Sequence, residues 1–296
     1  MEKLLNFEIT SVKAYEGKKS TWCPGCGDFG VLAALKQALF ELGISPYDAV
    51  VISGIGCSSK FPDYINTNAF HTIHGRLLPV ATGVKLANQK LNVIVTGGDG
   101  DGYGIGGNHF MHAARRNINL TYIVMNNEIY ALTKGQVAPT SPYGFVKGTT
   151  PYGSKDNPIE PCLISLSAGA TFVARGFSGD TKNLKEYIKE GIKHKGFSHI
   201  DVLSPCVTFN EEYSYDYFRE NIELFNGPFA RREEAIAKIM ETWRKGKIPV
   251  GIFYVEEKKH YELDIFGKED YSIVEEFKTQ KMPLKEELLK LIENKK

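Results

Sequence analysis

The fold is decided by the stretch NVIVTGGDGDGYGIGG, residues 92–107. It begins with a short apolar run that ends in glycine, which is typical of a strand buried on both faces of a parallel sheet. A glycine-rich turn with two aspartates follows at once, and a helical pattern covers 105–116. A strand, a turn and a helix in this order predict one unit of a doubly wound α/β sheet.

Similar units lie on both sides of this stretch. Short apolar runs predict further strands at 49–54, 120–125, 171–176, 199–204 and 250–256. Apolar periodicity predicts further helices at 30–42, 78–90, 161–169, 181–195, 230–244 and, at the charged end of the chain, 283–296. Asp28 is a candidate cap for the first helix, and Gly43 fits its end. The alternation predicts a doubly wound parallel sheet, interrupted at 133–160 by a loop whose length is typical of a functional or a disordered segment.

The composition is that of an ordinary globular protein, with 42% hydrophobic and 24% charged residues. The formal net charge of +1 gives no electrostatic basis for binding nucleic acid or an anionic membrane, so neither is expected as a partner. The sequence has no run of about 18 apolar residues, and its start, MEKLLNFEIT, lacks the apolar core of a signal peptide. We therefore expect a cytoplasmic protein.

Oxygen-bearing side chains follow two of the predicted strands. Asp99 follows the strand at 92–97 within a Gly-Asp-Gly turn, and the pair Asn126-Asn127 follows the strand at 120–125. The carboxyl ends of parallel strands share one edge of the sheet, where such folds bind ligands. A carboxylate, an amide and a backbone carbonyl just beyond them suit Mg²⁺ on a diphosphate. The glycines after Asp99 also allow backbone N–H groups to approach phosphates closely.

The same glycines match the dinucleotide fingerprint G-x-G-x-x-G at 102–107. That fingerprint requires an acidic residue about 20 positions further on, at the end of the next strand. Asn126 and Asn127 occupy that place, so NAD binding is the weaker interpretation.

The five cysteines are an odd number, which argues against a disulfide framework. Cys23 and Cys26 form a C-x-x-C pair, whereas Cys57 and Cys206 each follow a predicted strand and would lie at the edge of the diphosphate motif. Four thiolates that converge there could hold a [4Fe–4S] cluster or a structural zinc. The C-x-x-C pair alone could also be a redox disulfide. Cys162 begins an apolar run and is interpreted as an inert buried thiol.

A Gly-Asp-Gly turn, 25 residues and then an asparagine pair resemble the diphosphate-binding motif of thiamine-diphosphate enzymes. Further motifs occur with it in one order: TWCPGCGDFG, GIGCSSKFPDY, HTIHGR, GGNHFMHAARRN, NNEIYALTKGQVAPTSP and SPCVTFN. Over about residues 20–210 the chain therefore resembles the beta subunit of the 2-oxoacid:ferredoxin oxidoreductases.

The resemblance implies a doubly wound parallel sheet of the thiamine-diphosphate-binding, diphosphate-domain type with a C-terminal extension. Residues 1–210 would form the cofactor and cluster domain, and 211–296 would pack on that domain or on the partner. One [4Fe–4S] cluster is implied on Cys23, Cys26, Cys57 and Cys206, and Mg²⁺ on Asp99, Asn127 and the carbonyl of Ile129. The implied thiamine-diphosphate contacts are Ile55, Gly56, Cys57, Ser58, His74, Gly75, Arg76, Gly98, Gly100, Asp101, Gly102, Ala131 and Leu132.

The resemblance also implies an activity. It is the oxidative decarboxylation of a 2-oxoacid to acyl-coenzyme A and carbon dioxide, with coenzyme A as co-substrate and ferredoxin as electron acceptor. Lys60 and Leu132 would recognise the substrate, Lys60 as a point charge for a carboxylate. An alpha (or fused alpha–gamma) subunit would be the obligate partner. Two other classes stay open: a zinc-bearing structural module, and half of a non-oxidative thiamine-diphosphate decarboxylase.

Overall fold

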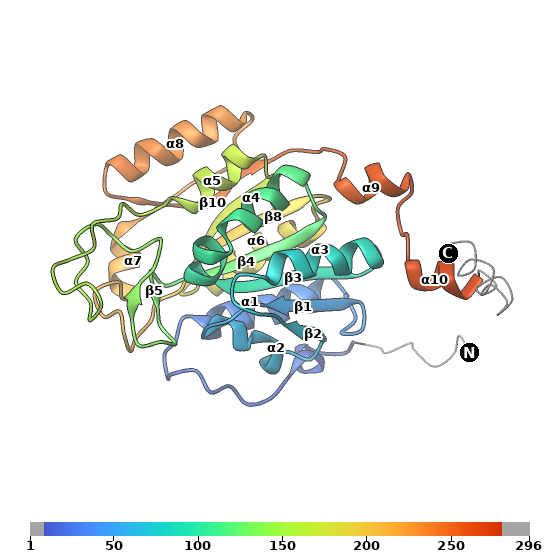
Figure 1. Ribbon diagram of the computed structural model, residues 1–296, viewed down its shortest axis with the longest axis horizontal. Coiled ribbons are helices and arrows are strands. Elements are labelled where there is room, and N and C mark those ends of the chain that lie inside the picture. The colour runs from blue at the N-terminus through green and yellow to red at the C-terminus, as the bar shows by residue number, and fades with distance from the viewer. Residues whose placement is uncertain (1–8, 280–296) are drawn as a thin grey trace, which may run out of the picture.

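A computed structural model describes residues 9–279, which are built around one eight-stranded sheet (Figure 1). The strands lie in the order β2 (Asn68–His71), β1 (Ala49–Ser53), β3 (Asn92–Gly98), β4 (Leu120–Asn126), β8 (Phe197–Leu203), β7 (Phe172–Phe177), β10 (Ile248–Val255) and β9 (Ile222–Leu224). Neighbouring strands of this sheet run parallel except β7 and β10. The predicted doubly wound parallel sheet is confirmed, with one antiparallel pair that the strand–helix alternation did not indicate.

Helices cover both faces of the sheet. One face packs against α3 (Leu77–Ala87), α4 (Gly107–Arg116), α5 (Pro161–Ala168) and α8 (Arg232–Arg244), which lie on the upper side in Figure 1. The other face packs against α1 (Asp28–Glu41), α2 (Phe61–Tyr64) and α6 (Thr181–Lys193). Val93 and Val95 of β3 enter the first core, whereas Ile94 enters the second. Successive side chains of a strand alternate between faces, so a continuous apolar run is what a doubly covered strand requires.

The remaining elements are short. They are η1 (Val12–Tyr15), η2 (Ser58–Lys60), the π-helical turn η3 (Gly100–Ile105), β5 (Ile129–Tyr130), β6 (Gln136–Val137), α7 (Tyr215–Asn221), α9 (Tyr261–Phe266) and α10 (Ile273–Thr279). β5 and β6 form a small antiparallel pair at the start of the predicted loop, and residues 138–160 contain no helix or strand. The helix predicted at 283–296 lies outside the described residues. In the described part of the chain, no helix combines the length and apolar character that a membrane span requires.

The predicted cap of the first helix was wrong. α1 begins at Asp28 itself, and Gly27 is the cap residue. The Asp28 carboxylate is buried and accepts a hydrogen bond of 2.8 Å from the Ser204 hydroxyl, so it ties the helix to the end of β8 instead. Gly43 does follow the helix end in a left-handed conformation, with φ of 65°, which favours glycine.

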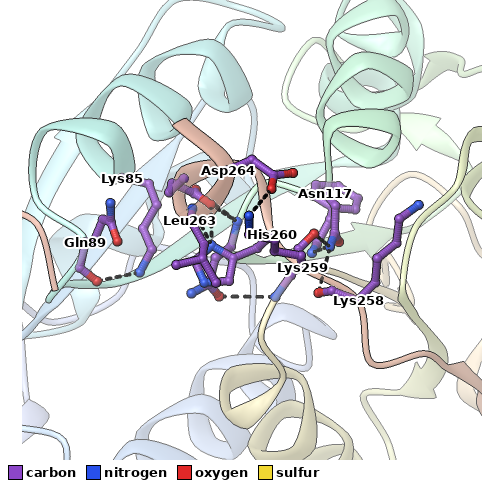
Figure 2. Close-up of polar contacts among 12 residues, drawn as sticks. Lys85, Gln89, Asn117, Lys258, Lys259, His260, Leu263 and Asp264 are labelled. Atoms are coloured by element: carbon purple, nitrogen blue, oxygen red, sulfur yellow. Dashed lines mark hydrogen bonds and ion pairs between the residues drawn. The ribbon is translucent and has the colours of Figure 1, made fainter. Parts of the chain in front are cut away.

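Residues after β10 form an arm that contacts the segment just before β4, and Figure 2 draws polar contacts of this arm. Asn117, which ends α4, donates through its Nδ2 to the carbonyls of Lys258 and Lys259. Glu262 of α9 is fully buried and accepts a hydrogen bond of 3.0 Å from the Asn119 backbone N–H. The arm is therefore anchored by buried polar contacts, and Tyr261 of α9 also packs against the core.

Lys85 of α3 lies near this arm and gives a pH prediction. Its Nζ donates to the carbonyls of Gln89 and Leu91, and burial lowers the pKa of Lys85 from 10.5 to about 8, with nearby Glu262 partly opposing the shift. Between these two values the unfolded chain holds a proton that the folded chain has lost, so the free energy of unfolding rises with pH. Relative to Lys85→Met, wild-type stability should rise by about 1.4 kcal/mol per pH unit across this window.

Denaturant unfolding of both proteins from pH 7 to 10.5 measures this difference. Because the other titrating groups are common to the two proteins, their effects cancel in the comparison. A difference that stays flat across the window would show that Lys85 keeps its ordinary pKa.

Candidate functional site

A pocket lies at the carboxyl ends of β1, β3 and β4, where the sequence predicted a cofactor. Its lining includes most of the predicted residues: Ile55, Gly56, Cys57, Ser58, His74, Gly98, Asp99, Gly100, Asp101, Asn127, Ile129, Ala131 and Leu132. Tyr130 and Thr133 complete the wall and were not predicted. The structure therefore brings both halves of the predicted diphosphate motif into one cavity.

Asp99 and Asn127 are the oxygen-bearing side chains in this pocket that fit a metal ion. Asp99 is 1% exposed and accepts a hydrogen bond of 2.5 Å from the Thr140 hydroxyl. Burial raises the pKa of Asp99 to about 7, because a desolvated carboxylate lacks a compensating charge. The Asn127 side-chain oxygen accepts from the Ile129 backbone N–H at 3.1 Å, which folds the turn between them. A divalent cation on these oxygens would supply the missing positive charge.

Asp101 joins three loops of the site. Its Oδ1 accepts hydrogen bonds from the backbone N–H of Ile55 at 3.1 Å, the backbone N–H of Gly75 at 2.7 Å and the His74 ring at 2.6 Å. These partners lie after β1 and β2, whereas Asp101 follows β3. Asp101 lines the pocket, but its main role in the fold is to hold together the loops around the predicted diphosphate site.

Three of the predicted cofactor contacts do not line the pocket. Gly75 supports it through the bond to Asp101, and Arg76 lies with its Nη1 3.5 Å from the carbonyl of Ile105. Gly102 packs beneath the turn, where an added Cβ would lie 1.7 Å from the Tyr122 hydroxyl. The sequence motifs indicate which segments surround the pocket. They do not distinguish residues that line it from residues that lie behind the lining.

The close approach at Gly102 gives a prediction on stability. Gly102→Ala should destabilise the fold by about 1–3 kcal/mol, because the new methyl group overlaps the Tyr122 hydroxyl in a packed core. The Tyr122 hydroxyl is buried and makes no hydrogen bond within residues 9–279. Its removal in Tyr122→Phe should therefore cost little and make room for the methyl group.

A double-mutant cycle tests this pair by thermal unfolding. The double variant should be more stable than Gly102→Ala alone. Additive effects of the two substitutions would show that the backbone turn, and not the hydroxyl, is what excludes a side chain.

The four predicted cluster cysteines line a second pocket beside the first. Cys23, Cys26, Cys57 and Cys206 lie around it together with Lys60. The Cys26 N–H donates to the Cys23 carbonyl at 3.0 Å, which closes the C-x-x-C turn. Nearby, the Trp22 ring N–H donates to the Cys57 carbonyl at 2.7 Å and ties two cysteine segments together. Cys57, Asn127, Ala131 and Leu132 line both pockets.

The cysteines of this pocket are free thiols in a partly desolvated place. Burial raises the pKa of Cys57 to about 11 and that of Cys26 further, with the neighbouring Asp28 carboxylate adding to both shifts. The thiolates would therefore require positive charge from bound metal. Cys162, by contrast, is a residue of α5 that is fully buried in the core, as predicted for an inert thiol.

The spacing of the thiols bears on the choice between zinc and a cluster. Zinc holds its ligands on one ion at about 2.3 Å, so their sulfurs must nearly touch. A [4Fe–4S] cluster holds each thiolate on a different iron, so its four sulfurs lie further apart. Four cysteines around one pocket fit either group.

Sequence reasoning missed a buried network beneath the asparagine turn. Asp201, in the middle of β8, is fully buried and accepts hydrogen bonds from the Arg175 Nε at 2.7 Å and the Tyr103 hydroxyl at 2.9 Å. It also accepts from the Asn126 Nδ2 at 3.3 Å, which fixes the side chain beside Asn127. The available signal was a charged residue inside a predicted buried strand, because such a charge requires a partner.

The sheet topology and the edge pocket define a thiamine pyrophosphate-dependent enzyme domain. The family model described as the C-terminal TPP-binding domain of thiamine pyrophosphate enzymes matches residues 54–202. A second model, the C-terminal part of the pyruvate ferredoxin oxidoreductase beta subunit, matches residues 206–268. The chain belongs to the beta subunits of the 2-oxoacid:ferredoxin oxidoreductases, and its partner is the alpha subunit of the same enzyme.

Individual relatives agree with this assignment. The chain is 47% identical over 251 residues to the beta subunit of the Saccharolobus solfataricus 2-oxoacid:ferredoxin oxidoreductase, covering 80% of this chain and 82% of the relative. It is 40% identical over 267 residues to the KorB subunit of 2-oxoglutarate synthase from Methanocaldococcus jannaschii, covering 88% and 94%. The solved 2-oxoglutarate:ferredoxin oxidoreductase of Magnetococcus marinus, which has 2-oxoglutarate, coenzyme A and succinyl-coenzyme A bound, superposes with a TM-score of 0.85 at 38% identity and 97% coverage of both chains.

Proposed function

We propose that this chain binds thiamine diphosphate with Mg²⁺ in the first pocket and a [4Fe–4S] cluster in the second. With its alpha (or fused alpha–gamma) partner it converts a 2-oxoacid and coenzyme A to acyl-coenzyme A and carbon dioxide, and ferredoxin accepts the electrons. Bound thiamine diphosphate would supply the carbon nucleophile and electron sink for decarboxylation, and the cluster would supply one-electron chemistry.

The observation that carries this proposal is the wall shared by the two pockets. Asn127, Ala131 and Leu132 lie on the segment after β4, and Cys57 lies on the segment after β1. A non-oxidative decarboxylase would have no use for four thiols beside its cofactor. A structural zinc module would have no use for the buried Asp99 in the adjoining cavity.

The chain's own residues have distinct duties in this proposal. Asp99, Asn127 and the Ile129 carbonyl would hold Mg²⁺, which suits hard oxygen ligands. Glycines at 98 and 100 would let the diphosphate approach the backbone closely. The protein's own packing also requires glycine at 100, because a Cβ there would lie 2.3 Å from the Tyr130 ring. The Tyr130 hydroxyl, which donates to the Gly100 carbonyl at 3.1 Å, would keep this turn in place.

Lys60 and Leu132 would face the substrate. Both line the cysteine pocket, and Leu132 also lines the cofactor pocket with 49% of its surface exposed. Lys60 donates to the Thr21 hydroxyl at 3.3 Å, a neutral partner that leaves its charge available for a carboxylate. The other side of the cofactor would be covered by the alpha subunit, so the isolated chain should not turn over substrate.

The test is the anaerobic visible spectrum of the complex with its alpha subunit, recorded before and after 2-oxoacid and coenzyme A are added. A brown protein with a broad band near roughly 400 nm that these additions bleach would support a substrate-reducible cluster. A colourless protein that contains zinc would contradict the proposed [4Fe–4S] cluster. Release of aldehyde without reduction of ferredoxin would indicate the non-oxidative reaction instead.

A further inference from the structure

A third pocket lies behind the asparagine turn and is separate from the two described above. It is enclosed by residues of the loop before α5, α7 and the α8–β10 connection, and its lining includes Glu128, Glu160, Arg175, Tyr213, Tyr217 and Trp243. It has no lining residue in common with the cofactor pocket or the cysteine pocket. The proposed function gives this pocket no role.

Glu128 is the residue that points to a ligand here. Its neighbours Asn127 and Ile129 line the cofactor pocket, whereas Glu128 between them lines the third pocket. Its φ is 62°, a left-handed conformation that is unfavourable for a residue with a Cβ. This conformation belongs to the turn that the Asn127 side chain closes, and it places Glu128 in the third pocket while its neighbours line the first.

The carboxylate of Glu128 lacks a partner. Its Oε2 is buried and makes no hydrogen bond to any residue between 9 and 279. The two cationic residues of the lining are already engaged. Arg175 bonds to both Glu160 and Asp201, and the Lys247 Nζ donates to the Glu220 carbonyl at 2.9 Å. A buried carboxylate without a partner is costly, and a cation in this pocket would offset that cost.

The other walls indicate which kind of cation. Tyr213, Tyr217 and Trp243 contribute aromatic side chains to the lining, and aromatic rings attract ammonium and guanidinium groups. Apart from the tyrosine hydroxyls, the other side-chain oxygens of the lining, on Asn126, Thr140 and Glu160, already bond to protein groups, so a metal ion would find few free ligands.

We propose that the third pocket binds a primary ammonium or guanidinium group, which pairs with Glu128 and lies against the aromatic rings. Two sources have this chemistry: a free small amine, and a lysine or arginine side chain of the alpha subunit. Because Asn126 lines this pocket beside the proposed metal ligand Asn127, an occupant would also support the turn that holds Mg²⁺.

The experiment uses the assembled complex of this chain with its alpha subunit. n-Butylammonium chloride is titrated in saturation-transfer NMR, with n-butanol as the uncharged probe and ionic strength held constant with sodium chloride. Saturable binding of the ammonium alone is expected, and Glu128→Gln should weaken it by about tenfold or more, the loss of one charge pair. Glu212→Gln, which removes a nearby exposed acid outside the lining, should bind within about twofold of wild type. Trp243→Leu changes a side chain that is 42% exposed and should weaken binding without affecting the fold.

A structure of the complex distinguishes the two sources. If the amine does not bind and a lysine or arginine of the partner lies within about 4 Å of the Glu128 carboxylate, the partner supplies the cation and the proposal holds. Equal binding by wild type and Glu128→Gln overturns it. So does a pocket that binds no amine and has no partner cation beside Glu128.

Discussion

Cys57→Ser is expected to abolish ferredoxin reduction by the complex while leaving thiamine diphosphate bound. Of the four predicted cluster cysteines, Cys57 alone lines both the cysteine pocket and the cofactor pocket. A serine hydroxyl has nearly the shape of the thiol but is a poor ligand for iron in a cluster held by thiolates. Iron and acid-labile sulfide should fall to background, and 2-oxoacid-dependent ferredoxin reduction should fall to below about 1% of wild type.

Two comparisons make this result specific. Cys162→Ala removes a fully buried cysteine from the core and should keep both the visible band and the activity. Thiamine diphosphate affinity of Cys57→Ser should stay within about threefold of wild type, because the metal ligands and the glycine turn are unchanged. Retention of iron by Cys57→Ser would remove this cysteine from the ligand set. A joint loss of cofactor and iron would instead indicate a collapsed site.

Much of this arrangement could be predicted because parallel strands constrain it. Successive side chains of the run 92–97 enter the two apolar cores in turn. Its continuous apolar composition therefore indicated that helices cover both faces of the sheet. Once β3 and β4 are parallel neighbours, the residues after them must share an edge. Asp99 and Asn127 therefore meet in one pocket although 27 residues separate them. The same reasoning placed Cys57 and Cys206 at that edge.

The features that were missed depend on tertiary contacts without a local pattern. Thr140 bonds to Asp99 from a loop with no periodicity, and nothing near it in the sequence indicates that partner. The apolar run of β10 predicts a strand but does not indicate its direction. That direction depends on the edge from which the chain enters the sheet. Asp28 resembles a cap because capping is local, yet Ser204 supplies a tertiary partner that overrides it.

Asp99→Asn is expected to remove most of the stabilisation of the complex by Mg²⁺ and thiamine diphosphate. Substitution of a residue that only supports a metal ligand typically lowers metal affinity by about 10–100-fold. Removal of a direct ligand should therefore lower it by about 100-fold or more. At a cofactor concentration of 100 times the wild-type Kd, bound cofactor stabilises the wild type by about 2.7 kcal/mol, and a variant with 100-fold weaker binding by only about 0.4 kcal/mol. Thermal unfolding with and without Mg²⁺ and cofactor measures both values.

The sign of the change in the cofactor-free complex separates a metal ligand from a structural carboxylate. Burial raises the pKa of Asp99 to about 7, so the empty site holds a carboxylate that the fold disfavours. Asparagine removes that penalty and can still accept the hydrogen bond from Thr140, so the cofactor-free variant should be at least as stable as wild type. Asp156→Asn, at an exposed position, should behave as wild type in both conditions. If Asp99→Asn instead destabilises the cofactor-free complex, the carboxylate supports the fold, and the metal must rely on other ligands.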